Sequence, residues 1–250
     1  MKRSLAYVVA GALLLGACAD TEQPPAPDAS DASDASGATT TDVLPGPTGR
    51  IVFKRLDPSL GFTVIYTVNP DGSHLEQLFP EEAEAPRWSP DGTEVAIFCC
   101  GDGMAAHLVN TGTGDLRTLP PPDPTLETYC GGPWSPDGTR LTCESFGMDD
   151  PSRNGIYSIR SSDGGGLKRI TSVPRGDDLP GDYSPDGDQL VFVRADRNGP
   201  LGVFVTNVDG TGLQRMTPSG MIIDDSGFAG RWSPKGDQIL VVARTAEDHH

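Results

Sequence analysis

The sequence predicts an all-β fold, a β-propeller built of four-stranded antiparallel blades, of which about four to five are present. First, an aromatic residue followed by Ser-Pro, a charged residue and Gly recurs at Trp88, Trp134, Tyr183 and Trp232, at intervals of 46, 49 and 49 residues. Second, strand-like runs follow every copy. Third, 31 Gly and 23 Pro in 250 residues indicate a chain with many turns. Four-stranded units that repeat every 45 to 50 residues, roughly, are typical of propeller blades.

Residues 1–17 predict a secretory signal peptide. Lys2 and Arg3 precede an apolar run of 13 residues, Leu5 to Ala17, which is shorter than the roughly 20 residues that a spanning helix needs. The run ends in Leu-Gly-Ala-Cys18, which resembles the lipobox of bacterial lipoproteins and implies a diacylated Cys18 as the new N-terminus. An ordinary signal peptide with an incidental Cys is the alternative. Residue 19 is Ala rather than Asp, and the sorting rule of Gram-negative lipoproteins then implies the outer membrane, facing the periplasm or the cell surface.

Residues 18–49 predict the lipidated Cys followed by a disordered linker. The segment is rich in Pro, Ala, Asp and Ser, including DASDASDAS at 28–36, and it cannot bury a core. As a coil of about 30 residues it would span on the order of 30 Å. We expect it to hold the propeller, residues 50–250, away from the membrane. A low-complexity stretch of no selected length is the alternative.

The repeated Ser-Pro-Asp-Gly predicts a hairpin turn with a structural rather than a ligand-binding role. Pro presets the backbone of the second turn position, and Gly accepts the positive φ that is common at the fourth. The predicted structural turn residues are Asp91, Gly92, Asp137, Gly138, Asp186, Gly187 and Gly236.

Two pairs of strands are expected in each unit. Apolar residues alternate after each turn, as at Val95 and Ile97, which favours a strand between other sheets. A second pair follows around an Asp-Gly turn, as in 64–79 and 202–217. The aromatic residue before each turn is interpreted as a wedge between blades, with ligand stacking as the alternative.

These motifs resemble the WD40-like (PD40) repeats of the TolB family, periplasmic propellers of the Tol-Pal envelope system, and the propeller domains of prolyl oligopeptidases. The resemblance covers residues 50–244. Strands of the second position occur at Ile51–Phe53 and again at Gln238–Val242, so the ring is not expected to close. The sequence is then either a fragment or an open propeller that covers its edges by association.

Two function classes remain. The net charge of −16 argues against nucleic acid, and neither His74 nor His107 lies in a catalytic or metal motif, so no catalytic residue, metal or cofactor is expected. The loops 101–103 and 148–150 lack the oxygen-rich register of a calcium loop. We therefore expect a lipid-anchored, non-catalytic scaffold that binds an envelope protein or cell-wall component. The alternative is the propeller portion of a hydrolase or lyase, gating substrate access to a catalytic domain.

Four cysteines lie beyond Cys18, namely Cys99, Cys100, Cys130 and Cys143. In an oxidising compartment they allow three complete disulfide connectivities. If Ser135 and Gly138 are the ends of a plain four-residue turn, Cys130 lies directly opposite Cys143 and a disulfide is feasible. A bulge at Gly138 would place the two side chains on opposite faces, and Cys99 or Cys100 could then be the partner. Free buried thiols are the third possibility, and metal binding is disfavoured because no C-x-x-C is present.

Overall fold

A computed structural model describes residues 49–100, 104–196, 201–218, 222–223 and 230–244. The chain forms two units, 1–42 and 43–250, and all described residues belong to the second. The predicted signal peptide, Cys18 and the linker up to residue 48 lie outside the described residues. Within the described part, no helix has the length and apolar character needed to cross a membrane.

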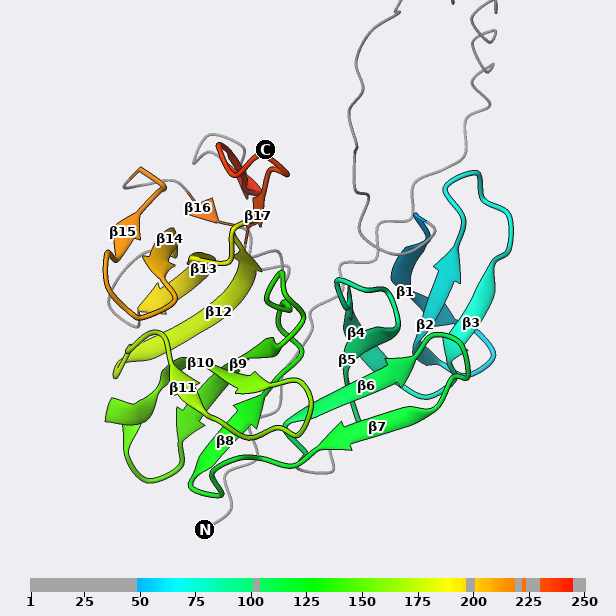
Figure 1. The fold of residues 1–250 in the computed structure, drawn as a ribbon, viewed down its shortest axis with the longest axis horizontal. Helices are drawn as coiled ribbons and strands as arrows, with labels where there is room; N and C mark the ends of the chain where they lie inside the picture. The colour runs from blue at the N-terminus through cyan, green and yellow to red at the C-terminus, as the bar shows by residue number, and fades with distance from the viewer. Residues whose placement is uncertain (1–48, 101–103, 197–200, 219–221, 224–229, 245–250) are drawn as a thin grey trace, which may run out of the picture. The chain divides into compact units, whose positions relative to one another are not determined.

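The described chain consists of antiparallel sheets (Figure 1). The first sheet has three strands: β1 (Ile51–Asp57), β2 (Phe62–Val68) and β3 (Glu76–Phe79). The second has β4 (Ala83–Trp88), β5 (Glu94–Cys99), β6 (Ala106–Asn110) and β7 (Leu116–Leu119). The third has β8 (Leu126–Tyr129), β9 (Arg140–Gly147), β10 (Gly155–Arg160) and β11 (Lys168–Arg169), with a short 3-10 helix, η1 (Pro151–Arg153), between β9 and β10. The fourth has β12 (Gly176–Tyr183), β13 (Gln189–Asp196), β14 (Gly202–Asn207) and β15 (Gln214–Arg215).

Two short strand pairs follow the fourth sheet. They are formed by β16 (Ile222–Ile223) with β19 (Ala243–Arg244) and by β17 (Arg231–Trp232) with β18 (Ile239–Leu240). The four sheets form a four-bladed β-propeller arrangement, which confirms the predicted fold class. The strands β5, β9 and β13 are the second strands of their sheets, and β1 corresponds to them in the first sheet, which lacks a first strand. After the fourth turn, β18 is again a strand of this second position.

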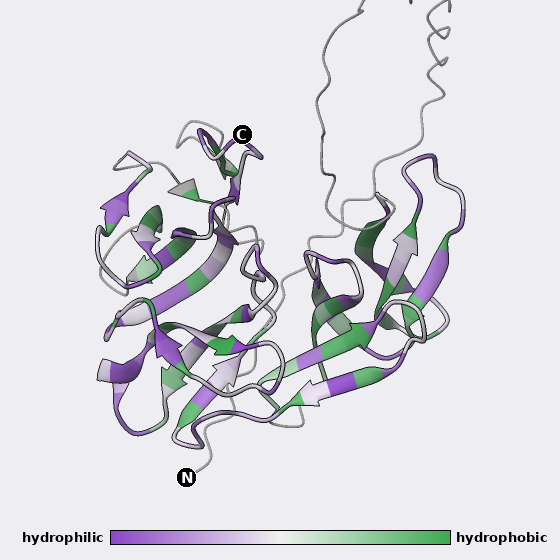
Figure 2. Cartoon of the chain, viewed as in Figure 1, coloured by the Kyte–Doolittle hydropathy of each residue, from purple (hydrophilic) through white to green (hydrophobic). Residues whose placement is uncertain are grey.

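Hydrophobic residues concentrate on the middle strands of the blades. Figure 2 shows β11 and β15, the last strands of their sheets, in hydrophilic colours, whereas β5, β6, β13 and β14 carry many hydrophobic residues. The middle strands are buried by neighbouring sheets on both faces, as their nearly continuous burial indicates. The last strands are shorter and face solvent, where charged side chains discourage further strand pairing.

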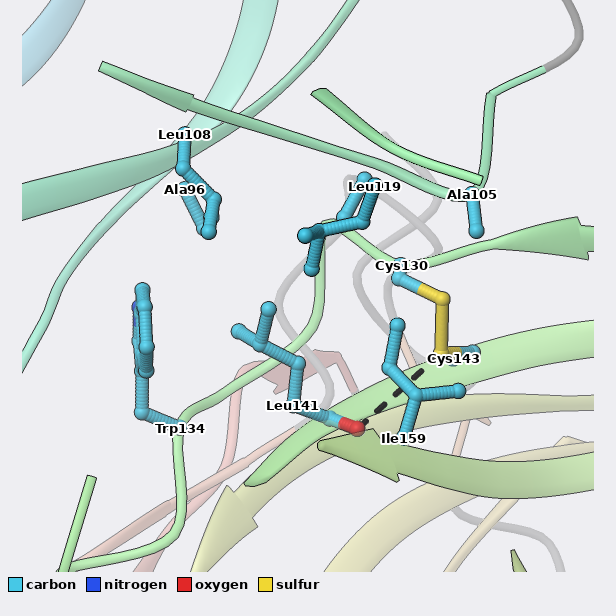
Figure 3. Packing of buried hydrophobic residues seen from close by; sticks show 10 residues of the cluster. Ala96, Ala105, Leu108, Leu119, Cys130, Trp134, Leu141, Cys143 and Ile159 are labelled. Atoms are coloured by element: carbon cyan, nitrogen blue, oxygen red, sulfur yellow. Dashed lines mark hydrogen bonds between the residues drawn. A yellow bond between two sulfur atoms is a disulfide. The ribbon is translucent and has the colours of Figure 1, made fainter. Parts of the chain in front are cut away.

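The aromatic residue that precedes each Ser-Pro turn packs between blades. The indole N–H of Trp134 donates to the carbonyl of Arg87 in the preceding blade, at 3.3 Å. Figure 3 shows Trp134 and Leu141 in one cluster with Ala96 and Leu108 of that blade. Trp88, Tyr183 and Trp232 belong to three further clusters of the same kind. Because each aromatic ring contacts two sheets, these residues hold successive blades together.

The Ser-Pro-Asp-Gly segments form the same turn in each blade. In the third blade, Gly138 N–H donates to the Ser135 carbonyl at 2.8 Å, and the Ser135 hydroxyl donates to the Asp137 carboxylate at 2.6 Å. That hydroxyl bond, with the Thr139 N–H bond, lowers the pKa of Asp137. Asp91 and Asp186 make equivalent bonds. In the fourth turn Lys235 replaces the Asp, and the Ser233 hydroxyl donates to Asp237 instead, at 2.8 Å.

Successive turns also pack against each other. A Cβ at Gly138 would lie 3.8 Å from Pro90 Cδ of the preceding turn, one at Gly187 would lie 3.5 Å from Pro136 Cδ, and one at Gly236 would lie 3.4 Å from Pro185 Cδ. All four turn glycines have positive φ, between 69° and 81°. The glycines therefore satisfy the turn backbone and leave room for the proline of the preceding turn.

We predict that Gly138→Val lowers the free energy of unfolding by about 1 to 2 kcal/mol. The φ of 71° strains a β-branched side chain by roughly this amount, and the Val methyl groups would also press on Pro90. Thermal melts check this. Gly138→Asn is the control, because Asn tolerates left-handed backbone. Equal stability of the Val and Asn variants would contradict the prediction.

Candidate functional site

An open groove of about 830 Å³ lies where the second sheet meets the third. Its walls come from β4, the end of β5, β6, the segment before β8, and β8 itself. We call it the acidic groove, because its described lining residues include four carboxylates and neither Lys nor Arg. The carboxylates are Glu81, Glu82, Glu84 and Glu127.

A bulge in β4 shapes one wall of the groove. The register between β4 and β5 shifts between Glu84 and Arg87, and Ala85 in the bulge has a φ of 48°. Bulges of this kind bend a strand and redirect its side chains. Below the bulge Glu84 pairs with Phe98, so a carboxylate and an aromatic ring stand side by side at the groove.

The carboxylates of the groove differ in their partners. Glu84 forms an ion pair with Lys54 and accepts the Thr63 hydroxyl at 2.7 Å. Burial alone would raise the pKa of Glu84, but the hydrogen bonds from Lys54 and Thr63 lower it. Glu127 accepts the phenol O–H of Tyr129. Glu81 and Glu82 are exposed. The groove therefore presents an excess of negative charge to solvent.

Apolar side chains lie among these carboxylates. Phe98 is 45% exposed and Met148 62% exposed, and both line the groove. Phe98 contacts Tyr129 with ring centroids 5.6 Å apart, and Tyr129 contacts Phe146 at 6.4 Å. Three aromatic rings thus bridge the two blades. An exposed apolar surface rimmed by charges is typical of a protein-binding site.

The cysteines form two disulfides, Cys99–Cys100 and Cys130–Cys143, which is one of the three connectivities considered above. Cys99, Cys100 and Cys130 line the groove. Cys143 is buried with Cys130 in the cluster drawn in Figure 3. His107 on β6 lies beside the first pair. Sequence reasoning missed this proximity because it arises from the pairing of β5 with β6.

A second group of acids lies between β9 and β12, outside the groove. Asp178 is 1% exposed and binds Arg194 through two bonds, Nε to Oδ1 and Nη2 to Oδ2, each 2.7 Å long. Nearby, burial and then the charges of Asp177 and Asp178 raise the pKa of Glu144 to about 8. Glu144 is thus held largely protonated at neutral pH.

We predict that Glu144→Gln stabilises the protein increasingly as the pH rises from about 4.5 to 8. The pKa of Glu144 is higher in the folded than in the unfolded protein, so binding of its proton stabilises the fold. This stabilisation is fully present below about pH 4.5 and is lost as the pH rises through 8. Gln mimics the protonated acid and avoids that loss. At pH 9 we expect a gain on the order of 2 kcal/mol, since one pKa unit corresponds to about 1.4 kcal/mol, and at pH 4.5 none.

Thermal melts of both proteins from pH 4.5 to 9 check this prediction. Glu81→Gln, at an exposed position, is the matched control and should follow the wild type throughout. Melting temperatures of the Glu144→Gln and wild-type proteins that run parallel over the whole range would contradict it.

Three charged residues from two blades and from the strand pair β17–β18 form a further cluster. They are Arg87 on β4, Asp182 on β12 and Arg231 on β17. Burial, and then the charge of Arg231, lower the pKa of Arg87 to about 10, while Asp182 opposes the shift. Arg231 also donates to the Gly181 carbonyl. These residues are far apart in sequence, so the reading of single repeats did not bring them together.

The candidate loops named from the sequence have structural roles where they are described. The carboxylate of Asp150 accepts the Ser152 N–H at 3.0 Å at the start of η1, and residues 101–103 lie outside the described part. His74 is exposed, and its carbonyl accepts a bond from Arg50 at 2.9 Å. Neither described segment gathers the residues of a catalytic centre.

Comparison with known proteins identifies relatives of the propeller. The family described as TolB beta propeller domain (PD40) matches residues 86–250. An uncharacterized protein of Agrobacterium fabrum, Atu1656, is 30% identical over 218 residues, which is 68% of this chain and 69% of that protein. A TolB homolog of Chlorobium luteolum is 31% identical over 158 residues, 62% of this chain and 34% of that protein.

Solved structures show the same fold. TolB from Acinetobacter baumannii superposes with a TM-score of 0.61 and 18% identity, over 79% of this chain and 46% of that one. A TolB from Agrobacterium tumefaciens, described as putative, gives 0.58 and 25%, over 81% and 73%. An oligogalacturonate lyase and a puromycin hydrolase each reach 0.56 at 16% identity, a likeness that shows the fold alone. This chain thus spans about a third to a half of the TolB proteins from Chlorobium and Acinetobacter.

Proposed function

Because this chain belongs to the TolB β-propeller domain family, we propose that it is a lipid-anchored, non-catalytic cell-envelope protein whose propeller serves as a protein–protein interaction scaffold. The observation that carries the proposal is the acidic groove between the second and third blades. We assign to it a basic, partly apolar segment of an envelope protein.

The charge and the surface of the groove support this partner. Four Glu and no Lys or Arg occur among its described lining residues, so a segment with Lys or Arg is attracted and an acidic one is repelled. Phe98 and Met148 offer apolar contact beside those charges. The volume of about 830 Å³ is in the range of sites that enclose a small ligand, and it suits a short stretch of peptide. An uncharged cell-wall glycan would not use the carboxylates as counter-charges.

Removing two groove charges tests the proposal. Glu81→Gln/Glu82→Gln and Phe98→Ala are compared with wild type in pull-downs from detergent-solubilised envelopes, with mass spectrometry of the retained proteins. Asp115→Asn/Asp188→Asn is the matched control, because it removes the same charge from exposed positions outside the groove. We expect a protein that wild type and control retain and that both groove variants lose at least tenfold. Equal retention by all four would exclude the groove as the interface.

The anchor is the second part of the proposal. The order of charge, apolar run, small residues and Cys18 supports lipidation at that residue, and Ala19 favours the outer membrane. Two acyl chains, at about 0.8 kcal/mol per buried methylene, suffice for stable attachment.

We predict that Cys18→Ser moves the protein from the membrane fraction to the soluble periplasmic fraction. The substitution removes the only proposed attachment, while the propeller begins some 30 residues later and should keep its melting temperature. Fractionation with immunoblotting measures the shift. Unchanged membrane partition of the variant would rule out Cys18 as the anchor.

A further inference from the structure

Three donor groups meet at the wall of the acidic groove. Cys99 ends β5, Cys100 follows it, and His107 lies on the neighbouring strand β6. Ile97 pairs with His107, so Cys99, two residues beyond Ile97, lies on the same face as the imidazole, diagonally across the strands. Cys100 has a φ of 75° and leaves the extended path. As a result, both sulfur atoms and an imidazole nitrogen lie within 4.8 Å of one another.

This spacing is close to that of a metal centre. Zinc binds thiolate sulfur at about 2.3 Å and imidazole nitrogen at about 2.0 Å, so tetrahedral ligands stand about 3.5 to 3.8 Å apart. Two Cys and one His are also a donor set that a thiophilic cation prefers over carboxylates. In the oxidised protein the sulfur atoms are joined and are not thiolate ligands. Metal binding and the disulfide therefore exclude each other.

We propose that Cys99, Cys100 and His107 form a redox-gated site for a thiophilic d¹⁰ cation, Zn²⁺ or Cu⁺, which is closed while the disulfide persists. A dithiol reductant opens it. One thiolate of the reductant attacks a sulfur of the Cys99–Cys100 bond, and its second thiol then resolves the mixed disulfide. Two electrons and two protons pass to the cysteines, and the reductant leaves as a disulfide. The cation then displaces the two thiol protons to solvent and binds both thiolates and the imidazole.

Two features make Cys99–Cys100 the bond that opens. Cys100 is exposed and Cys99 is partly exposed, whereas Cys130 is 1% and Cys143 0% exposed. In the folded protein a reductant therefore reaches the first pair, while the second is enclosed until the chain unfolds. A bond between adjacent residues also closes no chain loop, and it lacks the entropic stabilisation that a longer loop provides.

The surroundings favour a cation with an open coordination position. All three ligands line the groove, so the fourth position of a tetrahedral centre faces the groove and can take water or a donor from a bound molecule. The surplus of carboxylates attracts cations to the groove. His107 is 4% exposed, and its ring is held on a strand rather than on a loop, which fixes one ligand in advance.

The test measures metal binding by the full-length protein in both redox states. Wild type is treated with dithiothreitol, desalted without oxygen and titrated with Zn²⁺ against a chromophoric chelator; an untreated sample is titrated in parallel. We expect one additional Zn²⁺ per reduced chain and none per oxidised chain. With Co²⁺ as the probe, the reduced protein should show a thiolate-to-metal charge-transfer band, which reports sulfur ligation directly.

Variants assign the ligands. Cys100→Ser and His107→Asn should each weaken Zn²⁺ binding at least tenfold, while His74→Asn, a histidine outside the cluster, should bind like wild type. A readout without variants guards against misfolding: Zn²⁺ should protect Cys99 and Cys100 of reduced wild type from alkylation by iodoacetamide. Reduced wild type that binds no more Zn²⁺ than the oxidised protein, or whose Cys99 and Cys100 are alkylated equally fast with and without Zn²⁺, would overturn the proposal.

Discussion

Replacing Asp178 by Asn is expected to lower the free energy of unfolding by about 3 to 5 kcal/mol. The Asp178 carboxylate is 1% exposed and binds the guanidinium of Arg194 through two bonds of 2.7 Å. Removing one partner of a buried ion pair leaves the other charge without its counter-ion, which is among the costliest single substitutions in proteins. Asn can keep at most part of this geometry, because its NH₂ group faces the donors of Arg194.

The consequences should extend across the fourth blade, because Arg194 contacts more than Asp178. Its guanidinium lies over the rings of Phe192 and Phe204, 5.5 and 5.4 Å from their centroids. The carboxylate therefore fixes a side chain that covers three strands, β12, β13 and β14. A small part of the loss is offset, since the charge of Asp178 also contributes to the raised pKa of Glu144.

Urea denaturation at pH 7 measures this effect. Asp188→Asn is the control, because it removes an exposed charge from the turn before β13, and surface substitutions usually change stability by less than about 0.5 kcal/mol. A loss below about 1 kcal/mol in the Asp178→Asn protein would show that the pair contributes little.

The blades were predictable because their determinants are local. A Ser-Pro-Asp-Gly turn forms from bonds within six residues, such as Ser135 to Arg140, and the alternation after Trp88 requires no knowledge of distant segments. The wedge role of Trp134 followed from its recurrence. The packing of Gly138 against Pro90 of the preceding turn was missed, although the spacing of the repeats contained both residues.

The groove and the charge clusters were not predictable in this way. Glu84, Phe98 and Tyr129 come together only through a bulge in β4 and the docking of two sheets. Arg87 and Asp182 lie on blades whose relative placement no single repeat encodes. His107, seven residues after Cys100, met no spacing rule for metal ligands, because its proximity to Cys99 arises from strand pairing rather than from sequence distance.

The register around Cys130 and Cys143 shows how a wrong premise can leave a conclusion unchanged. The prediction assumed Ser135 opposite Gly138, but in the structure Ser135 N–H binds the Arg140 carbonyl at 2.9 Å and Trp134 pairs with Leu141. Ser135 therefore lies opposite Arg140, two residues further along the chain than the assumed partner Gly138. Closer to Cys130 the pairing shifts by two residues in the opposite direction, since Tyr129 pairs with Glu144. The two deviations cancel, and Cys130 again lies opposite Cys143.

Removing this disulfide is expected to lower the free energy of unfolding by about 3 kcal/mol in the Cys130→Ala/Cys143→Ala protein. The bond closes a loop with a sequence separation of 13, and closing a loop of about that length restricts the unfolded chain by roughly this amount. Both residues are buried in the cluster with Trp134 and Leu141, so Ala also leaves some space unfilled, which adds to the loss.

Urea denaturation of oxidised protein measures the loss, and non-reducing peptide mapping establishes which cysteines are joined. Cys99→Ser/Cys100→Ser is the matched control: it removes the other disulfide, which joins adjacent residues, and it should cost far less because no loop is opened. A reductant should then lower the stability of wild type toward that of the Cys130→Ala/Cys143→Ala protein and leave that double variant almost unaffected. Recovery of Cys130 and Cys143 as separate free thiols from envelope-purified protein would contradict the pairing.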